Sequence, residues 1–201
     1  MTQPRFESVL LEGSLVRVRP VCSGDARPAF EHLHGHPEIL DWLIWDGPSV
    51  VGELMDGYAQ WRNDSGSGVN YHFAIESLTG GAFLGAIGLR YEGHEHQGDI
   101  GYWIRSDAWG KGYASDALRL IDWLGFRQAD SMLHYATVFV GNDASARVLE
   151  KTGYTEDPAG AAKVAKHGQL VERRFFSINR RAWMARDGEW EPAVAEVLNQ
   201  V

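Results

Sequence analysis

The chain has 201 residues, of which 44% are hydrophobic and 11% aromatic, enough apolar side chain to bury a full core. Its 19 basic and 27 acidic residues leave a net charge of −8, which disfavours broad attraction to nucleic acid or to an anionic membrane surface. Cys22 is the only cysteine, which excludes an intrachain disulfide and a CxxC zinc or redox motif. We expect a cytoplasmic protein of one domain, residues 1–201, with 187–201 as a C-terminal tail.

The first half of the chain predicts strands and short helices. Apolar and basic residues alternate over 15–19, the period of a half-buried strand, and a proline closes this segment as an edge strand. Apolar residues at helical spacings, interrupted by two prolines, predict two short helices within 25–61. The polar stretch 63–68 is expected to be a loop, followed by a hairpin of strands 71–76 and 83–90.

A strand, a glycine-bearing loop and a helix follow in that order. Strand-forming side chains occupy 99–104, and the loop over 105–114 carries Gly110 and Gly112. From Ala114 an apolar i, i+3, i+4, i+7 stripe predicts a helix. A loop of small residues that opens a helix points backbone N–H groups at an anion, so phosphate is the expected ligand.

The remaining segments predict more strands on a mixed sheet. A nearly continuous apolar strand over 132–140 precedes a helix over 142–151. Strands are expected near Tyr154 and over 171–178. After residue 189, a proline followed by apolar residues at helical spacing predicts a short terminal helix.

Two phosphate-binding motifs fit the glycine loop poorly. A Walker A loop needs glycine six positions before Lys111 and serine or threonine after it, where Arg105 and Gly112 stand. A dinucleotide fingerprint that starts at Gly110 places Ser115 at its third glycine and lacks an initial βαβ unit. A nucleotide-dependent dehydrogenase is therefore a weaker alternative.

Three segments in order resemble the GNAT superfamily of N-acetyltransferases, in its RimJ/RimL-like branch. They are Ile100-Gly101-Tyr102-Trp103-Ile104, Trp109-Gly110-Lys111-Gly112-Tyr113-Ala114, and Asn142 through Ser145 to Leu149-Glu150-Lys151-Thr152-Gly153-Tyr154. The resemblance implies an α/β (α+β) GNAT fold, a mixed and mostly antiparallel sheet of about seven strands flanked by helices. It also implies transfer of an acetyl group from acetyl-CoA to a primary amine by direct attack, without a metal.

The resemblance also implies the residues that hold the coenzyme. The family often has glutamine or arginine where Trp109 stands, so backbone amides from Gly110 onward are expected to bind the pyrophosphate. A helix-initiating turn explains the glycines equally well when they are taken alone. The expected coenzyme-binding residues are Ile104, Arg105, Trp109, Gly110, Lys111, Gly112, Tyr113, Ala114, Asn142 and Ser145.

Acyl transfer to an amine needs a proton acceptor and a proton donor. Asp99 occupies the strand-entry position where these enzymes often place a carboxylate base, although a solvated strand-end aspartate is the alternative. Ser145 or Tyr154 is the candidate donor to the departing thiolate, and a backbone N–H near Ile104 is the candidate oxyanion ligand. Asn142 and Ser145 would also serve simply as helix-capping residues.

The acceptor side is expected to be aromatic. The resemblance places Trp42, Trp45 and Trp61 in the region that forms the acceptor-side wall in this branch, and the candidate substrate residues are Trp42, Trp45 and Trp103. An aromatic wall suits an amine through cation–π contact, although core packing explains most tryptophans. Histidines cluster at 32–36 and 94–96 without an HExxH motif, so no metal site is expected. Glu92, His94 and Glu95 are possible substrate or base residues, with solvated loop residues as the default.

The expected partner is an amine-bearing acceptor, either a peptide N-terminus or a small molecule, and neither nucleic acid nor membrane. The protein is expected to be a monomer or a homodimer. A catalytically silent acyl-CoA-binding or sensing protein on the same fold is the alternative function.

Overall fold

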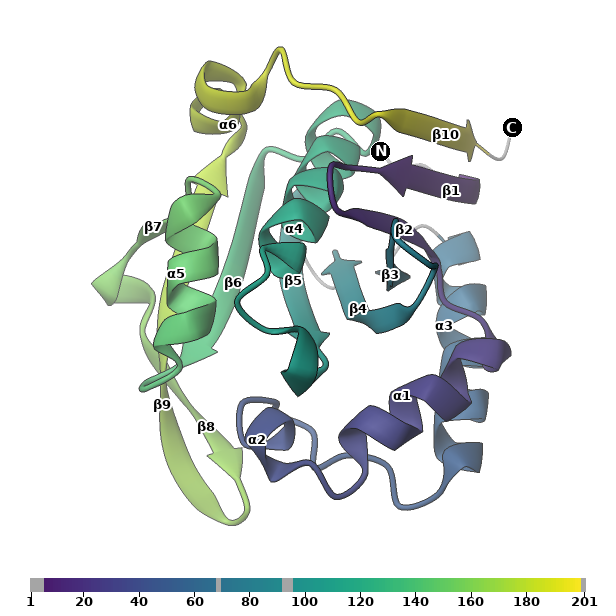
Figure 1. The fold of residues 1–201 in the computed structure, drawn as a ribbon. Coiled ribbons are helices and arrows are strands. Elements are labelled where there is room, and N and C mark those ends of the chain that lie inside the picture. Colours follow the sequence, from purple (N-terminus) through teal and green to yellow (C-terminus); the bar gives the residue numbers. More distant parts are fainter. Residues whose placement is uncertain (1–5, 68–69, 92–95, 200–201) are drawn as a thin grey trace.

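The computed structural model describes residues 6–67, 70–91 and 96–199, which form one sheet with helices on both faces (Figure 1). The strands are β1 (Phe6–Glu12), β2 (Val16–Pro20), β3 (Asn70–Ser77), β4 (Phe83–Arg90), β5 (Gln97–Ile104), β6 (Leu133–Phe139), β7 (Thr155–Glu156), β8 (Ala162–Lys166), β9 (Gln169–Asn179) and β10 (Val194–Asn199). The α-helices are α1 (Ala26–Leu33), α2 (Pro37–Leu40), α3 (Val51–Ser67), α4 (Tyr113–Trp123), α5 (Asp143–Lys151) and α6 (Arg180–Asp187).

The sheet is antiparallel except at one pair of strands. Its order is β10-β1-β2-β3-β4-β5-β6-β9-β7, and β8 pairs with β9. The parallel pair is β5–β6, which is joined only from Gln97↔Leu133 to Asp99↔Tyr135. Beyond Asp99 the two strands diverge, so the sheet opens at its centre.

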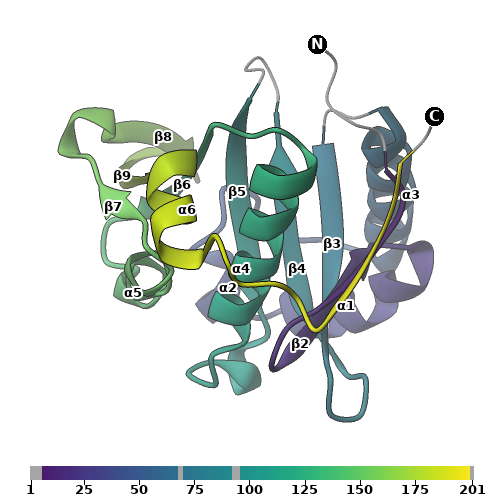
Figure 2. The same ribbon diagram turned by 90° about the horizontal axis from the view of Figure 1, so that it is seen from above.

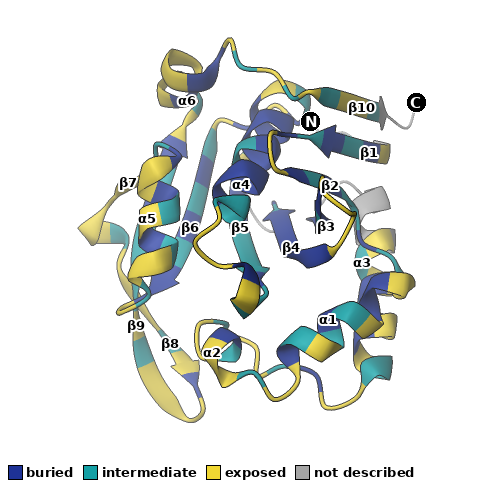
Figure 3. Cartoon of the chain, in the orientation of Figure 1, coloured by how far each residue is buried: buried dark blue, intermediate teal, exposed yellow. Residues whose placement is uncertain are grey.

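Hydrophobic cores lie on the two faces of the sheet. One core packs α4 and α5 against the sheet through Leu118, Ile121 and Leu149. The other packs α1 and α3 through Leu33 and Tyr58. Figure 2 shows α4 on one side of the central strands and α1, α2 and α3 on the other, and Figure 3 shows burial concentrated in α4 and the strands behind it.

The structure corrects three predictions in the N-terminal half. The predicted edge strand at 15–19 is wrong, because β2 lies between β1 and β3. The loop predicted over 63–68 is also wrong up to residue 67, because α3 continues through Ser67. Segment 25–61 begins three α-helices rather than two, and α3 is 17 residues long.

The C-terminal tail is a strand rather than the predicted helix. β10 pairs antiparallel with β1, from Phe6↔Asn199 to Glu12↔Val194, and extends the sheet beyond β2 (Figure 1). The sheet of the described residues has ten strands instead of about seven, because β1, β8 and β10 were not predicted. The mixed, mostly antiparallel architecture is confirmed. No helix among the described residues is long and apolar enough to cross a membrane.

Candidate active site

A cavity of about 1060 Å³, here called the cleft, lies where β5 and β6 diverge. Side chains alternate along a strand, so the two faces of β5 present different residues to it. Ile100, Tyr102 and Ile104 pack on the α4 side, whereas Trp103 packs on the side of α1 and α3. The cleft is lined by residues from both faces and therefore crosses the sheet.

Most of the predicted site residues line this cleft. They are Trp42, Trp45, Asp99, Trp103, Ile104, Trp109, Gly110, Gly112, Tyr113, Ala114, Asn142 and Ser145. Arg105, Lys111 and Tyr154 are not among the lining residues. The structure thus brings together the glycine loop, the N-terminus of α5 and the tryptophan side chains, which come from distant parts of the chain.

Main-chain groups of β5 point into the gap between the strands. The Arg105 N–H faces β4, because it donates to Leu84 O at 2.8 Å. The Trp103 carbonyl also faces β4, because its oxygen would lie 2.0 Å from a Cβ built on Gly85. Because main-chain groups alternate in direction along an antiparallel strand, those of Tyr102 and Ile104 face the opposite side. That side is the opening toward β6, where an extended ligand could pair with them as a further strand does.

The glycine loop presents a row of N–H groups at the N-terminus of α4. Gly110 and Gly112 have φ values of 74° and 86°, the left-handed region that glycine adopts without steric cost. The backbone N–H groups from Gly110 to Ser115 make no hydrogen bond to any residue that the structure describes. These donors at the positive end of the helix dipole form an anion site.

The longer side chains of the loop are tied elsewhere. Trp109 Nε1 donates to Ile104 O at 2.7 Å, so the indole braces the loop against the end of β5. Lys111 Nζ donates to Asp107 O at 3.0 Å, and Arg105 forms an ion pair with Asp107 at 2.5 Å. The side chains of Arg105 and Lys111 are therefore turned to the loop itself, and the anion site consists of main-chain groups, the Lys111 N–H among them. Their predicted role in coenzyme binding stays a prediction.

Ser145 and Tyr102 form a hydrogen-bonded pair on the α5 side of the cleft. The Tyr102 hydroxyl lies 2.9 Å from Ser145 Oγ. Burial raises the pKa of Tyr102 to about 12, against the opposing effect of its hydrogen bond with Ser145. Asn142 caps α5, and its Oδ1 accepts from the Ser145 N–H at 3.1 Å. The pair can hold and donate a proton at the edge of the gap.

Asp99 lies on the opposite face, at the last residue of β5 that pairs with β6. Its Oδ2 accepts from Arg90 Nη2 at 2.8 Å, and the two side chains are about one-third exposed. Oδ1 accepts no hydrogen bond from the described residues. Asp99 is thus a charged, oriented carboxylate with one oxygen available to a molecule in the cleft.

Tyr154 is a buried core residue. It is 3% exposed, and its hydroxyl donates to Asp122 Oδ1 at 2.7 Å. His134 Nδ1 lies 2.7 Å from the same oxygen, and burial raises the pKa of Asp122. The structure therefore does not place Tyr154 where it could protonate a thiolate in the cleft.

Four tryptophans surround the α3 side of the cleft. Trp42 and Trp45 are 39% and 43% exposed, and Trp103 is half-buried. Trp61 stacks on His72 with ring centroids 4.2 Å apart. The exposed rings of Trp42 and Trp45 are available to a ligand.

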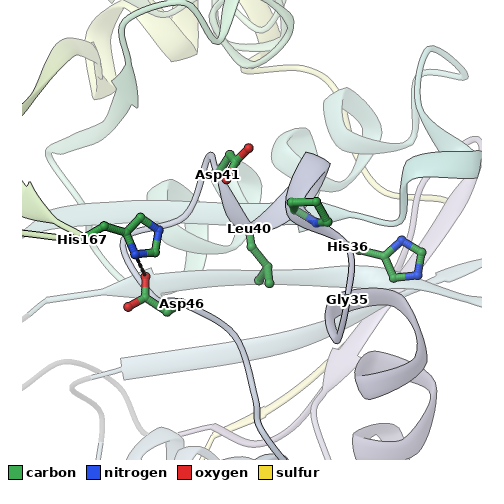
Figure 4. A pocket seen from close by; sticks show the side chains of 7 residues that line it. Gly35, His36, Leu40, Asp41, Asp46 and His167 are labelled. Carbon is green, nitrogen blue, oxygen red and sulfur yellow. Dashed lines mark ion pairs between the residues drawn. The ribbon is translucent and has the colours of Figure 1, made fainter.

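The hairpin of β8 and β9 holds the segment that carries Trp42. Lys166 Nζ donates to Leu40 O at 2.9 Å and also to Leu43 O, and the Lys166 side chain is only 6% exposed. Beside this contact, His167 and Asp46 line a smaller cavity of about 250 Å³, and their Nδ1 and Oδ1 atoms lie 3.4 Å apart (Figure 4). The hairpin tip therefore fixes one wall of the cleft.

The sequence analysis missed several polar residues that line the cleft. They are His72, Arg90, Tyr102, Thr137 and Arg173. Tyr102 belongs to the segment Ile100–Ile104 that resembles the family, and its alternation with Trp103 along β5 was the available signal. The others depend on strand pairing between distant segments, which the sequence does not display.

Metal ligation has no candidate cluster in the described ranges, because no three His, Cys, Asp or Glu side chains gather there. His34 and His36 instead contact Pro48 O at 3.0 Å and Glu38 at 2.9 Å. Glu92, His94 and Glu95 lie outside the described residues.

The row of unpaired N–H groups and the opening between β5 and β6 form a site that suits an extended ligand with an anionic group. Comparison with known proteins identifies the family. The model of the acetyltransferase (GNAT) domain matches residues 16–155, and the chain belongs to the GNAT acetyltransferase family. It is therefore an acyltransferase of the N-acetyltransferase class.

Individual proteins are similar over most of the chain. The uncharacterised Bacillus subtilis protein YkkB is 31% identical over 142 residues, which cover 69% of this chain and 80% of YkkB. Mycobacterium smegmatis RimJ, solved in complex with CoA-disulfide, superposes with a TM-score of 0.75 at 22% identity, covering 92% of this chain and 97% of RimJ. Spermidine N-acetyltransferase from Vibrio cholerae, solved with CoA and spermine, gives a TM-score of 0.71 at 18% identity, with coverage of 84% and 98%.

Proposed function

We propose that the protein binds acetyl-CoA in the cleft and transfers the acetyl group to a primary amine. The observation that carries this proposal is the run of N–H groups from Gly110 to Ser115 without protein acceptors, next to a β5 edge that faces a gap. Those N–H groups would hold the pyrophosphate, and the main-chain groups of Tyr102 together with the Ile104 N–H would pair with the pantetheine arm. The thioester of acetyl-CoA supplies an activated acetyl group. CoA in the structures of RimJ and the spermidine enzyme supports this assignment.

Residues on one face of the sheet would accept the proton from the amine, and residues on the other face would donate a proton to the leaving thiolate. Asp99 has a free carboxylate oxygen on the tryptophan side, where an amine enters, and it would take the amine proton directly or through a water molecule. The Tyr102–Ser145 pair holds a proton on the α5 side and would supply it to the leaving thiolate. A main-chain N–H of Tyr102 or Ile104 would stabilise the oxyanion.

Release of free thiol from acetyl-CoA across a panel of amines tests the function. Asp99→Asn should lower kcat by about tenfold or more near pH 7 and leave the KM for acetyl-CoA unchanged. The defect should shrink as pH approaches about 10.4, because an alkyl amine then loses its proton without help. Asp107→Asn is the matched control, since Asp107 is exposed and pairs only with loop residues.

Two outcomes would contradict the proposal in different ways. Unaltered turnover of Asp99→Asn would remove Asp99 from the base role and leave acetyl transfer intact. Stabilisation by acetyl-CoA without thiol release for any amine would favour the silent binding protein. The predicted cytoplasmic location, the single-domain boundaries and the monomeric or homodimeric state stay predictions.

A further inference from the structure

An arginine on the acceptor side of the cleft has no charged partner. Arg173 lines the cleft, and its Nη1 donates to the neutral hydroxyl of Thr137 at 3.1 Å. Its Nε is buried without a hydrogen-bond partner in the described part of the chain, and no carboxylate there lies within ion-pair distance of it. Proteins seldom leave a buried guanidinium N–H unpaired, so a ligand oxygen is the natural acceptor.

The position of Arg173 assigns it to the acceptor rather than to the coenzyme. Arg173 bonds the side chain of Thr137, whereas the neighbouring β6 residues Ala136 and Val138 face the core of α4 and α5. Arg174, next along β9, instead pairs with Glu156 at 2.7 Å and reaches the α5 side. Alternation along both strands therefore directs Arg173 to the face that carries Asp99 and Trp103.

Trp42 and Arg173 both lie near the C-terminal end of β6. A Cβ built on Gly141, just beyond β6, would lie 3.7 Å from the Trp42 ring. Arg173 pairs in register with Phe139, the last residue of β6. A single small molecule can thus place a flat apolar group against the Trp42 ring and an anionic group against the Arg173 guanidinium.

The charges that line the cleft disfavour a polycation. The only carboxylates among the described lining residues are Glu53 and Asp99. Asp99 is paired with Arg90, and Glu53 is exposed and accepts from the Ser49 N–H at 2.7 Å. A polyamine could pair with few acidic side chains here. A carboxylate could instead bind Arg173, whose planar guanidinium group suits bidentate hydrogen bonding.

We propose that the acceptor is an aromatic α-amino acid, or a close analogue with a carboxylate beside the amine, bound through Arg173 and the rings of Trp42 and Trp45. The inference rests on the proposed acetyl transfer. A bond forms between the amine nitrogen and the acetyl carbon, and the carbon–sulfur bond of the thioester breaks. The amine proton passes to Asp99, and the sulfur takes a proton from the Tyr102–Ser145 pair.

Matched acceptors that differ only in the carboxylate test the proposal. Thiol release at saturating acetyl-CoA would be measured with L-tryptophan against tryptamine, L-phenylalanine against phenethylamine, and spermidine. We expect kcat/KM to be at least tenfold higher for each amino acid than for its decarboxylated partner. Arg173→Met should lower kcat/KM at least tenfold for L-tryptophan and less than twofold for tryptamine.

Control variants separate this role from a general loss of structure. Arg174→Met removes a guanidinium from the adjacent residue on the other face and should leave both acceptors unaffected. Arg173→Lys keeps the charge without the bidentate fork and should recover part of the loss seen in Arg173→Met. The KM for acetyl-CoA should stay within twofold of wild type in all three variants.

Three results would overturn the assignment. The first is a higher kcat/KM for spermidine, and the second is a higher kcat/KM for the decarboxylated amines. The third is an equal loss of kcat/KM for both members of a pair in Arg173→Met. Each contradicts a ligand carboxylate bound to Arg173, while thiol release itself upholds acetyl transfer. Absence of thiol release with any amine would instead refute the proposed function and this inference with it.

Discussion

Replacement of Gly112 by alanine tests whether the N–H row of the loop holds the coenzyme. Gly112 is the N-cap of α4 and has φ of 86°, and a Cβ there would lie 3.2 Å from Leu15 Cδ1. An L-residue in the left-handed region costs about 1–2 kcal/mol. For a domain of this size that lowers Tm by roughly 2–8 °C. The strain is relieved when φ turns negative, and that rotation turns the adjacent N–H groups away from the anion.

The effect on coenzyme affinity follows from the number of donors lost. A hydrogen bond to a charged group contributes about 1.5–3 kcal/mol, so loss of a single donor already raises Kd about tenfold. Loss of two approaches a hundredfold or more. Isothermal titration of CoA into Gly112→Ala and wild type measures this change directly.

Gly80→Ala is the matched control for backbone strain. Gly80 lies in the β3–β4 turn with φ of 82°, and nothing lies within 4 Å of a Cβ built there. This variant should lose similar stability and bind CoA as wild type does. Equal CoA affinity in both variants, alongside equal loss of Tm, would refute the assignment of the loop as the pyrophosphate site.

Three further substitutions examine the rest of the cleft. Because burial raises the pKa of Tyr102 to about 12, its hydroxyl is only about 1% ionised at pH 10. Tyr102→Phe should therefore lower kcat on the order of a hundredfold at every pH from 7 to 9.5, and a changed profile shape would contradict this. Lys166→Met should raise the acceptor KM about tenfold and spare that of acetyl-CoA, whereas Lys163→Met on the same hairpin should change neither. Tyr154→Phe should cost about 1–3 kcal/mol of stability in thermal unfolding, since Asp122 loses a buried donor, and a lower kcat without that loss would contradict a structural role.

The segments that could be predicted are those whose signal is local. The hairpin of β3 and β4 follows from alternating strands around a glycine turn. Neighbouring residues in the sequence likewise predict the glycine loop, the apolar stripe of α4 and the Asn142 cap of α5. Each of these needs no knowledge of what the segment packs against, and each was confirmed as an element.

The errors arise where a distant partner decides the structure. Val194, Val197 and Leu198 have helical spacing, yet β1 offers an unpaired edge and the tail forms β10 along it. The same pairing places β2 inside the sheet, although its own alternation fits an edge equally well. Hydrogen bonds to a neighbouring strand thus outweigh local preference.

Tyr154 shows the same limit within the site. Its place at the end of the segment 142–154 that resembles the family suggested a catalytic hydroxyl. The direction of a side chain after α5, however, depends on the residues against which it packs. Asp122 and His134, from α4 and β6, provide a buried hydrogen-bonding site that draws the hydroxyl into the core. The burial of a tyrosine with a polar partner follows ordinary packing rules but requires the tertiary contacts to be known.

The two sides of the cleft differ in how the chain builds them, and this explains which half was predictable. The coenzyme side is one continuous run from β5 through the loop into α4, joined by the start of α5. The proposed acceptor side combines the segment around Trp42, helix α3 and Arg173 of β9. The Lys166 contact holds the Trp42 segment to the β8–β9 hairpin. Because these pieces contribute little to the N–H row or the β5 edge, substitutions in them can change the acceptor without weakening the coenzyme site. If the proposed acceptor assignment is correct, amine selectivity depends on these long-range contacts, and Arg173→Met is the substitution that should change it.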